Sequence, residues 1–309
     1  MKHISPLFVY VKTVCWTFGL SVTLLSSCSK QAEFEYIDEA TESEVSVITV
    51  TGEDGNESLL AKGSVIGVYV TGVDGSVTLK RTVVGEGGEA ALPSTASGGS
   101  VGMVAYTPYK EDWGEAALYD GATFTVSSDQ STSEGYRGSD LMIGSAGQIT
   151  RARSSNTVTM HHVLARVAIH IVDETGRINL DDISAELLNV NNTVTVSLKE
   201  QSVSTISTLR DDIRMYSGAT TDWRVSSYAI VAPQTVTEGT SFYAVTLYGN
   251  REIYPIPATV TLEGGKTYTI NMRLTSVGLI LDGWSITDWL EEGEEELEAA
   301  MESQHTRKG

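Results

Sequence analysis

The sequence predicts an all-β protein built from β-sandwiches with Greek-key connections. Three observations support this prediction. Short runs rich in Val, Thr, Ser and Tyr recur from Val45 onward, clusters of Gly, Asp and Asn separate these runs, and helix-favouring segments are scarce. Short strands divided by turn residues in this way are typical of sandwiches rather than of helical or α/β domains.

The clearest predicted strand is residues 268–274, in which every second residue is apolar and the residues between are polar. That alternation predicts a strand with one face in the core and the other in water. Further strands are predicted at residues 45–50, 65–70, 101–106, 122–126, 193–198, 228–232, 242–248 and 258–262. Glycine-containing turns lie between them, at residues 54–56, 74–75, 98–99 and 264–265.

The longest predicted strand covers residues 160–172, where branched apolar side chains occupy every second position on one face. A polar stretch at residues 147–156 precedes it and is the best linker in the chain. We therefore expect a domain boundary near Asn156. It would separate one sandwich in residues 44–156 from a second of about equal size in residues 157–290.

The N-terminus has the pattern of a secretory signal in residues 1–27. Lys2 and Lys12 give a basic start, and a largely apolar run at residues 13–25 is too short to cross a bilayer. A leucine three residues before Cys28 and a serine directly before it make this segment resemble a bacterial lipobox, which predicts lipidation of Cys28. Each buried methylene of such an anchor contributes about 0.8 kcal/mol. The alternative is an ordinary signal peptide with a chance cysteine.

Acidic residues dominate the charge of the chain, which has a formal net charge of -19. Because residues 1–27 carry two lysines and no acidic residue, the remainder is near -21. A surface this acidic repels nucleic acid, so no nucleic-acid partner is expected. Residues 28–43 are polar and acidic without periodicity and read as a tether, and residues 291–309 form an acidic tail.

The residues that usually carry metal or thiol chemistry are few. Cys15 lies in the signal and Cys28 is the expected lipidation site, so the mature fold has no disulfide and no cysteine ligand. His161 and His162 are adjacent on a predicted strand and therefore point to opposite faces. His162 and His170 share a face but are separated by about 26 Å at about 3.3 Å per residue. We expect structural histidines and no metal or other cofactor.

No constellation in the sequence indicates catalysis. No serine lies in a nucleophile-elbow context, and the acidic residues cluster in the tether, the turns and the tail. The glycine-rich residues 85–89 lack a lysine and a following helix, so they do not form a phosphate loop. The sequence therefore favours a structural or binding protein over an enzyme.

Tryptophan offers an alternative function. Trp113, Trp223, Trp284 and Trp289 could stack on sugars, in which case the chain would be a surface lipoprotein that binds glycans for nutrient capture. Trp284 and Trp289 lie close to the last predicted strand, and we expect them to cover the core rather than form a binding platform.

Several segments together resemble the fimbrillin family of anaerobic Gram-negative bacteria, in family order along nearly the whole mature chain. They are residues 66–70 (IGVYV), 105–109 (AYTPY), 126–130 (VSSDQ), 139–142 (SDLM), 160–167 (MHHVLARV), 232–234 (APQ), 265–268 (GKTY) and 284–289 (WSITDW). The resemblance implies a type V pilus subunit with two transthyretin-like sandwiches in tandem. Such subunits are exported as lipoproteins to the outer membrane and are exposed at the cell surface.

In this family a protease removes the first strand of a stalk subunit, and a neighbouring subunit donates a strand that fills the groove. The resemblance thus implies other fimbrial subunits as partners by strand exchange, and a host or bacterial surface receptor for an adhesive subunit. Residues 45–50 are the candidate removable strand, and Lys62 is the first basic residue after it and hence the candidate cleavage site. Family stalk subunits typically present an arginine there, and this chain has none before Arg81.

A donated strand should alternate apolar and polar residues, whereas the chain after Trp289 is rich in glutamate and poor in β-branched residues. The tail therefore does not suit an apolar groove. We expect an accessory subunit at the tip or the membrane anchor of a fimbria rather than a stalk subunit.

Overall fold

The structure is a computed structural model. It describes residues 44–51, 56–60, 62–86, 88–91, 100–119, 121–146, 157–174, 183–219 and 224–289. Only the backbone is described for residues 44–51, 56–59, 100, 101, 157, 219 and 224. All of these residues belong to one compact unit.

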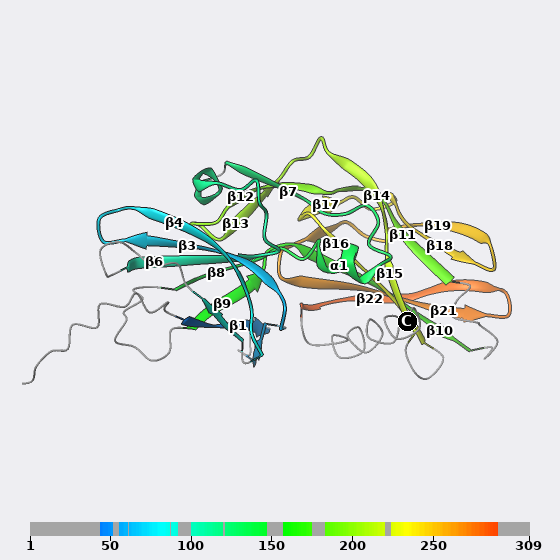
Figure 1. The fold of residues 1–309 in the computed structure, drawn as a ribbon. Helices are drawn as coiled ribbons and strands as arrows, with labels where there is room; N and C mark the ends of the chain where they lie inside the picture. The colour runs from blue at the N-terminus through cyan, green and yellow to red at the C-terminus, as the bar shows by residue number, and fades with distance from the viewer. Residues whose placement is uncertain are drawn as a thin grey trace, which may run out of the picture. The chain divides into compact units, whose positions relative to one another are not determined.

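The fold is all-β, as the sequence predicts (Figure 1). The described residues form 22 strands in five sheets, together with the short α-helix α1 (Ser133–Arg137) and a single 3-10 turn, Glu115–Leu118. The Thr132 hydroxyl accepts a hydrogen bond from the Gly135 amide and thereby caps α1. Helix is therefore restricted to short connections between strands.

The largest sheet has eight strands and contains most of the first half of the described chain. Its order is β2 (Asn56–Leu59), β1 (Glu44–Thr51), β9 (Thr157–His162), β8 (Met142–Ala146), β6 (Ser100–Thr107), β3 (Val65–Gly72) and β4 (Val77–Val83), with β5 (Glu89–Ala91) also paired to β1. Because β5 contacts β4 as well as β1, this sheet curls back on itself. We call it the curled sheet.

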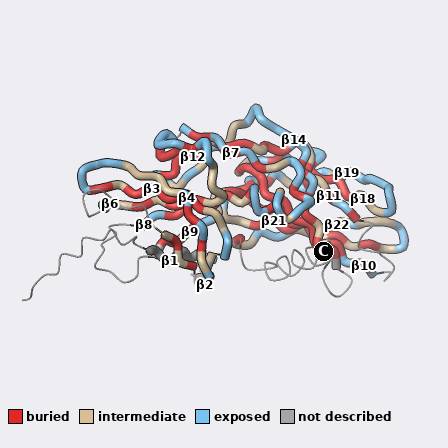
Figure 2. Tube along the Cα trace, in the orientation of Figure 1, coloured by how far each residue is buried: buried red, intermediate tan, exposed pale blue. Residues whose placement is uncertain are grey.

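The second half forms two larger sheets. The five-stranded sheet has the order β15 (Tyr216–Ala219), β16 (Arg224–Val231), β10 (Ala165–Asp173), β21 (Lys266–Thr275) and β22 (Gly278–Asp288). The four-stranded sheet has the order β14 (Arg210–Arg214), β11 (Ile183–Asn191), β18 (Ser241–Leu247) and β19 (Asn250–Pro255). Buried residues follow β10 and β21, whereas the β18–β19 turn is exposed (Figure 2).

Two small sheets complete the fold. One has the order β13 (Ser202–Thr205), β12 (Thr193–Ser197) and β7 (Ala122–Thr125), and the other pairs β17 (Gln234–Val236) with β20 (Val260–Leu262). β7 and β12 come from opposite sides of the predicted boundary near Asn156 and pair from Thr125↔Thr193 onward. The buried Gln130 amide also donates to and accepts from the backbone of Ile230, at 2.8 Å each. The division into residues 44–156 and 157–290 stays a prediction, and these bonds join its two parts.

The apolar core consists of two clusters of buried side chains. The larger one, which we call the main cluster, spans the five-, four- and three-stranded sheets and one face of the curled sheet. The smaller one, the inner cluster, lies on the other face of the curled sheet. Strand alternation separates them along β3, where Ile66 and Val68 belong to the inner cluster and Tyr69 to the main cluster.

The prediction of one continuous strand over residues 160–172 is wrong. β9 ends at His162 and β10 begins at Ala165, and the two strands belong to different sheets. Between them the Val163 amide donates to the Leu141 carbonyl at 3.1 Å, and the Leu164 carbonyl accepts from Gly265 at 2.9 Å. The apolar alternation continues through this change of partners, so the sequence pattern does not reveal it.

Each of the other predicted strands falls on a strand of the structure. Several other strands were not predicted, including β4, β8, β11, β19 and β22. The predicted turns at residues 74–75 and 264–265 are confirmed by Gly75 and Gly265, which have φ angles of 81° and 75°. Such positive φ values favour glycine.

Candidate functional site

The predicted removable strand is β1, and neighbours flank it on both sides. Residues 46–49 of β1 pair in parallel with β9, from Ser46↔Thr157 to Thr49↔Met160. On its other side β1 pairs antiparallel with β5 and then with β2. β1 therefore fills a position between β9 and β5, and its loss would leave the edges of both strands unpaired.

The inner cluster lies on one face of the curled sheet and includes residues of β5 and β9, the two strands between which β1 lies. Its members are apolar and almost fully buried: Ile66, Val68, Val70, Val84, Ala90, Met103, Ala105, Met142, Val158 and Met160. Leu60, directly after β2, packs against the same cluster. Burial of one such side chain contributes roughly 1.5–3 kcal/mol, so opening this face to water would be strongly unfavourable.

Lys62 lies in the turn between β2 and β3, after both β1 and β2. Its side chain is 67% exposed and forms an ion pair with Glu86 at 3.2 Å, and the Glu86 side chain is 86% exposed. An ion pair this open to water contributes little to stability. The backbone after Lys62 is therefore accessible at the surface, whereas the strands before it are paired.

Cys28, the tether in residues 28–43, Trp223 and the acidic tail in residues 291–309 lie outside the described residues. The segment at 290–301, the one part of the sequence that favours helix, lies outside them as well. Lipidation of Cys28 therefore stays a prediction. Within the described part of the chain, no helix is long and apolar enough to cross a membrane.

Two segments of the family resemblance, residues 160–167 and 284–289, meet in space and lock the end of β22. The Trp289 ring stacks on the His162 ring with a centroid distance of 4.3 Å and an interplanar angle of 11°. The Arg166 guanidinium lies 5.2 Å from the centre of the Trp289 ring and donates to the Trp289 carbonyl oxygen. Asp140 and His162 share a 2.7 Å hydrogen bond. We call these four residues the clasp.

The clasp places a cationic side chain in the protein interior, since Arg166 is fully buried. Its Nε donates to the Thr267 hydroxyl at 2.9 Å, and its guanidinium also lies 5.8 Å from the centre of the Tyr228 ring. Buried charges are tolerated when hydrogen bonds and aromatic faces replace water. The guanidinium therefore has a structural role in holding Trp289.

The other histidines do not converge. His161 is exposed, and His170 lies on β10 with its ring centre 6.0 Å from that of Tyr228. In the part of the chain that the structure describes, no three His, Cys, Asp or Glu side chains lie close enough to hold a metal ion. The pairing between His162 and Asp140 could not be predicted from the sequence, because the two residues lie on different segments.

The three tryptophans that the structure describes do not form an exposed platform. Trp113 and Trp289 are only 4% and 3% exposed and belong to the main cluster. Trp284 is partly buried and packs against the same cluster. The expectation that Trp284 and Trp289 cover the core is therefore confirmed.

Comparison with known proteins gives a consistent result. A family model described as fimbrillin-like matches residues 49–289. A candidate cell adhesion protein from Bacteroides ovatus has a similar structure, with a TM-score of 0.63 and 15% identity over 82% of this chain and 99% of that one. A second from Bacteroides uniformis has a TM-score of 0.57 and 16% identity over 80% of this chain and 98% of that one. At these identities the likeness shows a shared fold. No curated protein matches this sequence.

Proposed function

Because this chain belongs to the fimbrillin-like family of surface fimbrial and adhesion proteins, which are not enzymes, we propose that it is a fimbrial subunit assembled by β-strand addition. In this proposal Cys28 carries the lipid that anchors the protein in the outer membrane. The partners are other fimbrial subunits, each of which contributes or accepts a strand.

One observation carries this proposal: β1 occupies a position between β9 and β5, and both of these flanking strands contribute residues to the apolar inner cluster. If β1 leaves, two rows of backbone donors and acceptors and an apolar surface become available together. An incoming strand of alternating apolar and polar residues would satisfy both needs. The same arrangement explains why an intact chain would not assemble, since its own β1 already fills the position.

Cleavage after Lys62 would detach both β1 and β2, because Lys62 follows both strands. Leu60 would leave with them and uncover a further part of the inner cluster. The exposed turn around Lys62 suits a trypsin-like protease, which needs an accessible basic residue in extended or turn backbone. Lys62 is therefore the proposed maturation site.

We further propose an accessory position, at the tip or the membrane anchor, rather than a place in the stalk. The reason lies in the sequence beyond Trp289, which has seven glutamates between residues 291 and 302 and few β-branched residues. A strand of that composition would carry charges into an apolar groove, at a high cost in free energy. Such a subunit accepts a strand and does not donate one from this end.

Limited proteolysis tests the proposal. Trypsin should cut the intact protein after Lys62, and N-terminal sequencing should then find Gly63 at the new terminus. Cleaved protein should form oligomers, alone or with a fimbrial stalk subunit, in light scattering after size exclusion. The Lys62→Gln variant should stay monomeric under the same treatment, whereas Lys199→Gln, at another exposed turn lysine, should assemble like the original protein.

Two results would contradict this proposal, the first against strand addition and the second against Lys62 as the maturation site. One is protein that is cut after Lys62 and loses residues 1–62 but stays monomeric with every stalk subunit tried. The other is assembly of the Lys62→Gln variant to the same extent and at the same rate, which would exclude Lys62 as the maturation site.

A further inference from the structure

The five-stranded sheet is buried on both faces along parts of β10 and β21. All residues in Ala165–Ile169 of β10 and in Thr267–Ile270 of β21 are buried. Successive residues of a strand point to opposite faces, so such runs occur where both faces of a sheet are covered. The main cluster covers the face that carries Val167 and Ile169. We call the opposite face the outer face.

The outer face is deeply buried near the start of β10 and more open further along. Arg166 and Ala168 of β10 lie on it beside Thr267 and Thr269 of β21, their partners in the parallel register. These four residues are 0%, 1%, 3% and 8% exposed respectively. Val172, on the same face near the end of β10, is 39% exposed. The cover on the outer face therefore lies over its first rows.

Trp289 brings the chain onto this face directly after β22. Its carbonyl oxygen accepts hydrogen bonds from the Arg166 guanidinium and, at 3.3 Å, from the Thr267 hydroxyl. Its ring lies over Arg166. Ala168 and Thr269 are one row further in on the same face. The residues that follow Trp289 along the chain thus start beside the rows that are buried.

Those residues have the pattern of an amphipathic helix. Leu290, Leu297 and Met301 are spaced by seven and four residues. At about 100° per residue they fall within about 40° of one another around a helix, as an apolar stripe does. The acidic tail contributes seven glutamates between residues 291 and 302. A helix over residues 290–301 is about 18 Å long, more than the roughly 7 Å between Thr267 and Thr269.

The charge of the outer face complements these glutamates. The ionisable side chains at the outer-face positions of β10 and β21 are Arg166, His170 and Arg273, which are all basic. Glu174 and Asp282 each bond to Arg273 at 3.1 Å, at the end of the face away from Trp289. Near Trp289 the face is therefore basic, and its short side chains allow a helix to approach closely.

We propose that the acidic tail docks on the outer face of its own chain as an amphipathic helix, with Leu290, Leu297 and Met301 against the sheet. Burial of both faces of β10, the position of Trp289 and the charge of the two surfaces support this occupant. The inference goes beyond the proposed function, since it gives the tail a place within its own subunit. It does not depend on cleavage at Lys62 or on removal of β1.

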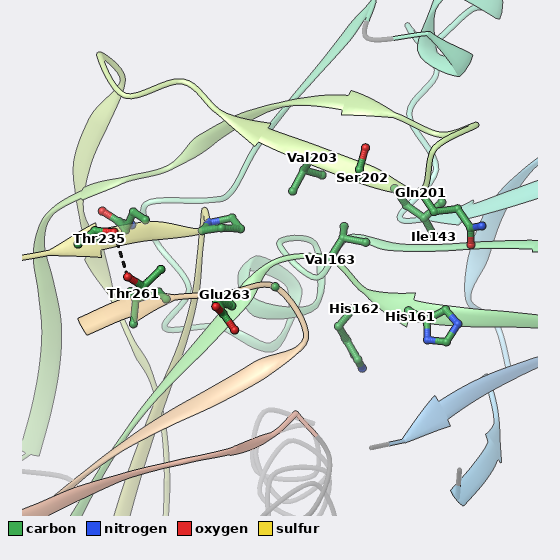
Figure 3. A pocket seen from close by; sticks show the side chains of 14 residues that line it. Ile143, His161, His162, Val163, Gln201, Ser202, Val203, Thr235, Thr261 and Glu263 are labelled. Atoms are coloured by element: carbon green, nitrogen blue, oxygen red, sulfur yellow. Dashed lines mark hydrogen bonds between the residues drawn. The ribbon is translucent and has the colours of Figure 1, made fainter. Parts of the chain in front are cut away.

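A groove of about 630 Å³ beside the connection between β9 and β10 offers the tail another place. His162, on which Trp289 stacks, also borders this groove (Figure 3). Glu263 borders it too, and the described residues that line it include no lysine or arginine. The glutamates of the tail would therefore meet a like charge there. The outer face suits the tail better.

Photocross-linking on the intact chain tests where the tail lies. A p-benzoylphenylalanine residue in place of Leu297 should cross-link within the same chain to peptides of β10, β16 or β21, identified by mass spectrometry. The matched control carries the same residue in place of Ala299, which lies about 180° from the apolar stripe around a helix. It should give much less of these products.

Thiol labelling gives a second measure. A Thr269→Cys side chain should react slowly with a maleimide, and Leu297→Asp with Met301→Asp should speed its reaction about tenfold, the equivalent of about 1.4 kcal/mol of docking. Ala299→Asp should leave the rate unchanged. Ser285→Cys, in the same row on β22 but exposed, should react fast with either tail. Peptide mass spectrometry separates these sites from the native cysteines.

The proposal is overturned if position 297 gives no cross-link to β10, β16 or β21 of its own chain. Cross-links to β13 or β20 would assign the tail to the groove, and cross-links between two chains would assign the outer face to a second copy. An unchanged labelling rate at residue 269 in the Leu297→Asp, Met301→Asp protein would also overturn it, because something other than the tail then covers Thr269.

Discussion

In the curled sheet β1 lies between β9 and β5, the strands that contribute to the inner cluster, whereas the five-stranded sheet ends with β22, which the clasp holds through Trp289 directly after it. Both strands hydrogen-bond to long neighbours, β9 and β21 respectively. They differ in how they are connected to the rest of the chain. β22 is one hairpin turn away from β21, and Trp289, directly after β22, belongs to the main cluster.

The two strands differ in whether a single cut of the backbone would release them. A single cut after Lys62 separates β1 and β2 from the rest of the chain, so only noncovalent contacts then hold them. β22 has no such exposed cut between it and β21, because the connecting turn is only residues 276–277 and neither is basic. If Lys62 is the maturation site, as proposed, a single cut releases β1 from the rest of the chain, whereas no comparable cut releases β22.

The largest expected effect comes from removing the clasp. Trp289→Ala should lower the free energy of unfolding by about 3–5 kcal/mol, since it leaves a cavity and takes away the face on which His162 and Arg166 pack. Urea denaturation followed by circular dichroism measures this loss. The matched control is Ile286→Ala on the same strand, where the side chain is 53% exposed and the expected loss is below about 1 kcal/mol.

Equal losses for Trp289→Ala and Ile286→Ala would contradict the role of the clasp, because the end of β22 would then be held by backbone bonds alone. Hydrogen exchange provides a second measure. The Trp289 amide donates to the Gly265 carbonyl at 3.0 Å, and its protection should fall in the Trp289→Ala variant.

The inner cluster should respond to a smaller change in a more local way. Met160→Ala should lower the free energy of unfolding by about 2–3 kcal/mol, since Met160 is fully buried in β9. Faster hydrogen exchange should be confined to the curled sheet, in β9, β8 and β6, while β10 and β21 keep their protection. Equal acceleration in both regions would show that the two clusters unfold as one unit and would weaken the comparison.

The sequence predicted the class of fold well, because period-two alternation and glycine turns are local signals. Residues 268–274 show this, since β21 contains all of them and burial alternates from Ile270 to Leu274, although Thr269 on the opposite face is buried too. The break at Val163 was missed because both β9 and β10 keep the alternation while changing partners. β22 was missed because Gly283, with a φ of 148° at a register shift, interrupts its apolar pattern.

Of the candidate site, only the proposed cleavage residue could be predicted from the sequence. Its identification depends on the order of residues along the chain. Lys62 could be found by reading along the chain for the first basic residue after a strand, and its exposure agrees with that choice. The clasp and the covered outer face depend on contacts between residues far apart in the chain, such as His162 with Trp289. No spacing rule in one sequence connects such residues, so these features required the structure.

The smallest expected effect is a difference in the free energy of unfolding between two tyrosine-to-phenylalanine variants. One tyrosine lies on the curled sheet and the other on the four-stranded sheet. The Tyr69 hydroxyl donates to the Gly114 carbonyl at 2.8 Å, whereas the Tyr243 hydroxyl is buried without a hydrogen-bond partner among the described residues. Tyr69→Phe should lower the free energy of unfolding by about 1 kcal/mol, because it leaves a carbonyl without this donor. Tyr243→Phe should be neutral or slightly stabilising, since it removes a hydroxyl that gains nothing from burial.

Each variant should be compared with the original protein at pH 7, where neither tyrosine hydroxyl of the original protein ionises. Burial raises the pKa of Tyr69 and of Tyr243 to about 12. The folded state favours the neutral hydroxyl. The resulting contribution to the free energy of unfolding is complete below the unfolded pKa of about 10 and is lost as the pH rises toward 12. If Tyr243→Phe destabilises as much as Tyr69→Phe in urea denaturation, the Tyr243 hydroxyl must have a partner, and the two regions would not differ in this respect.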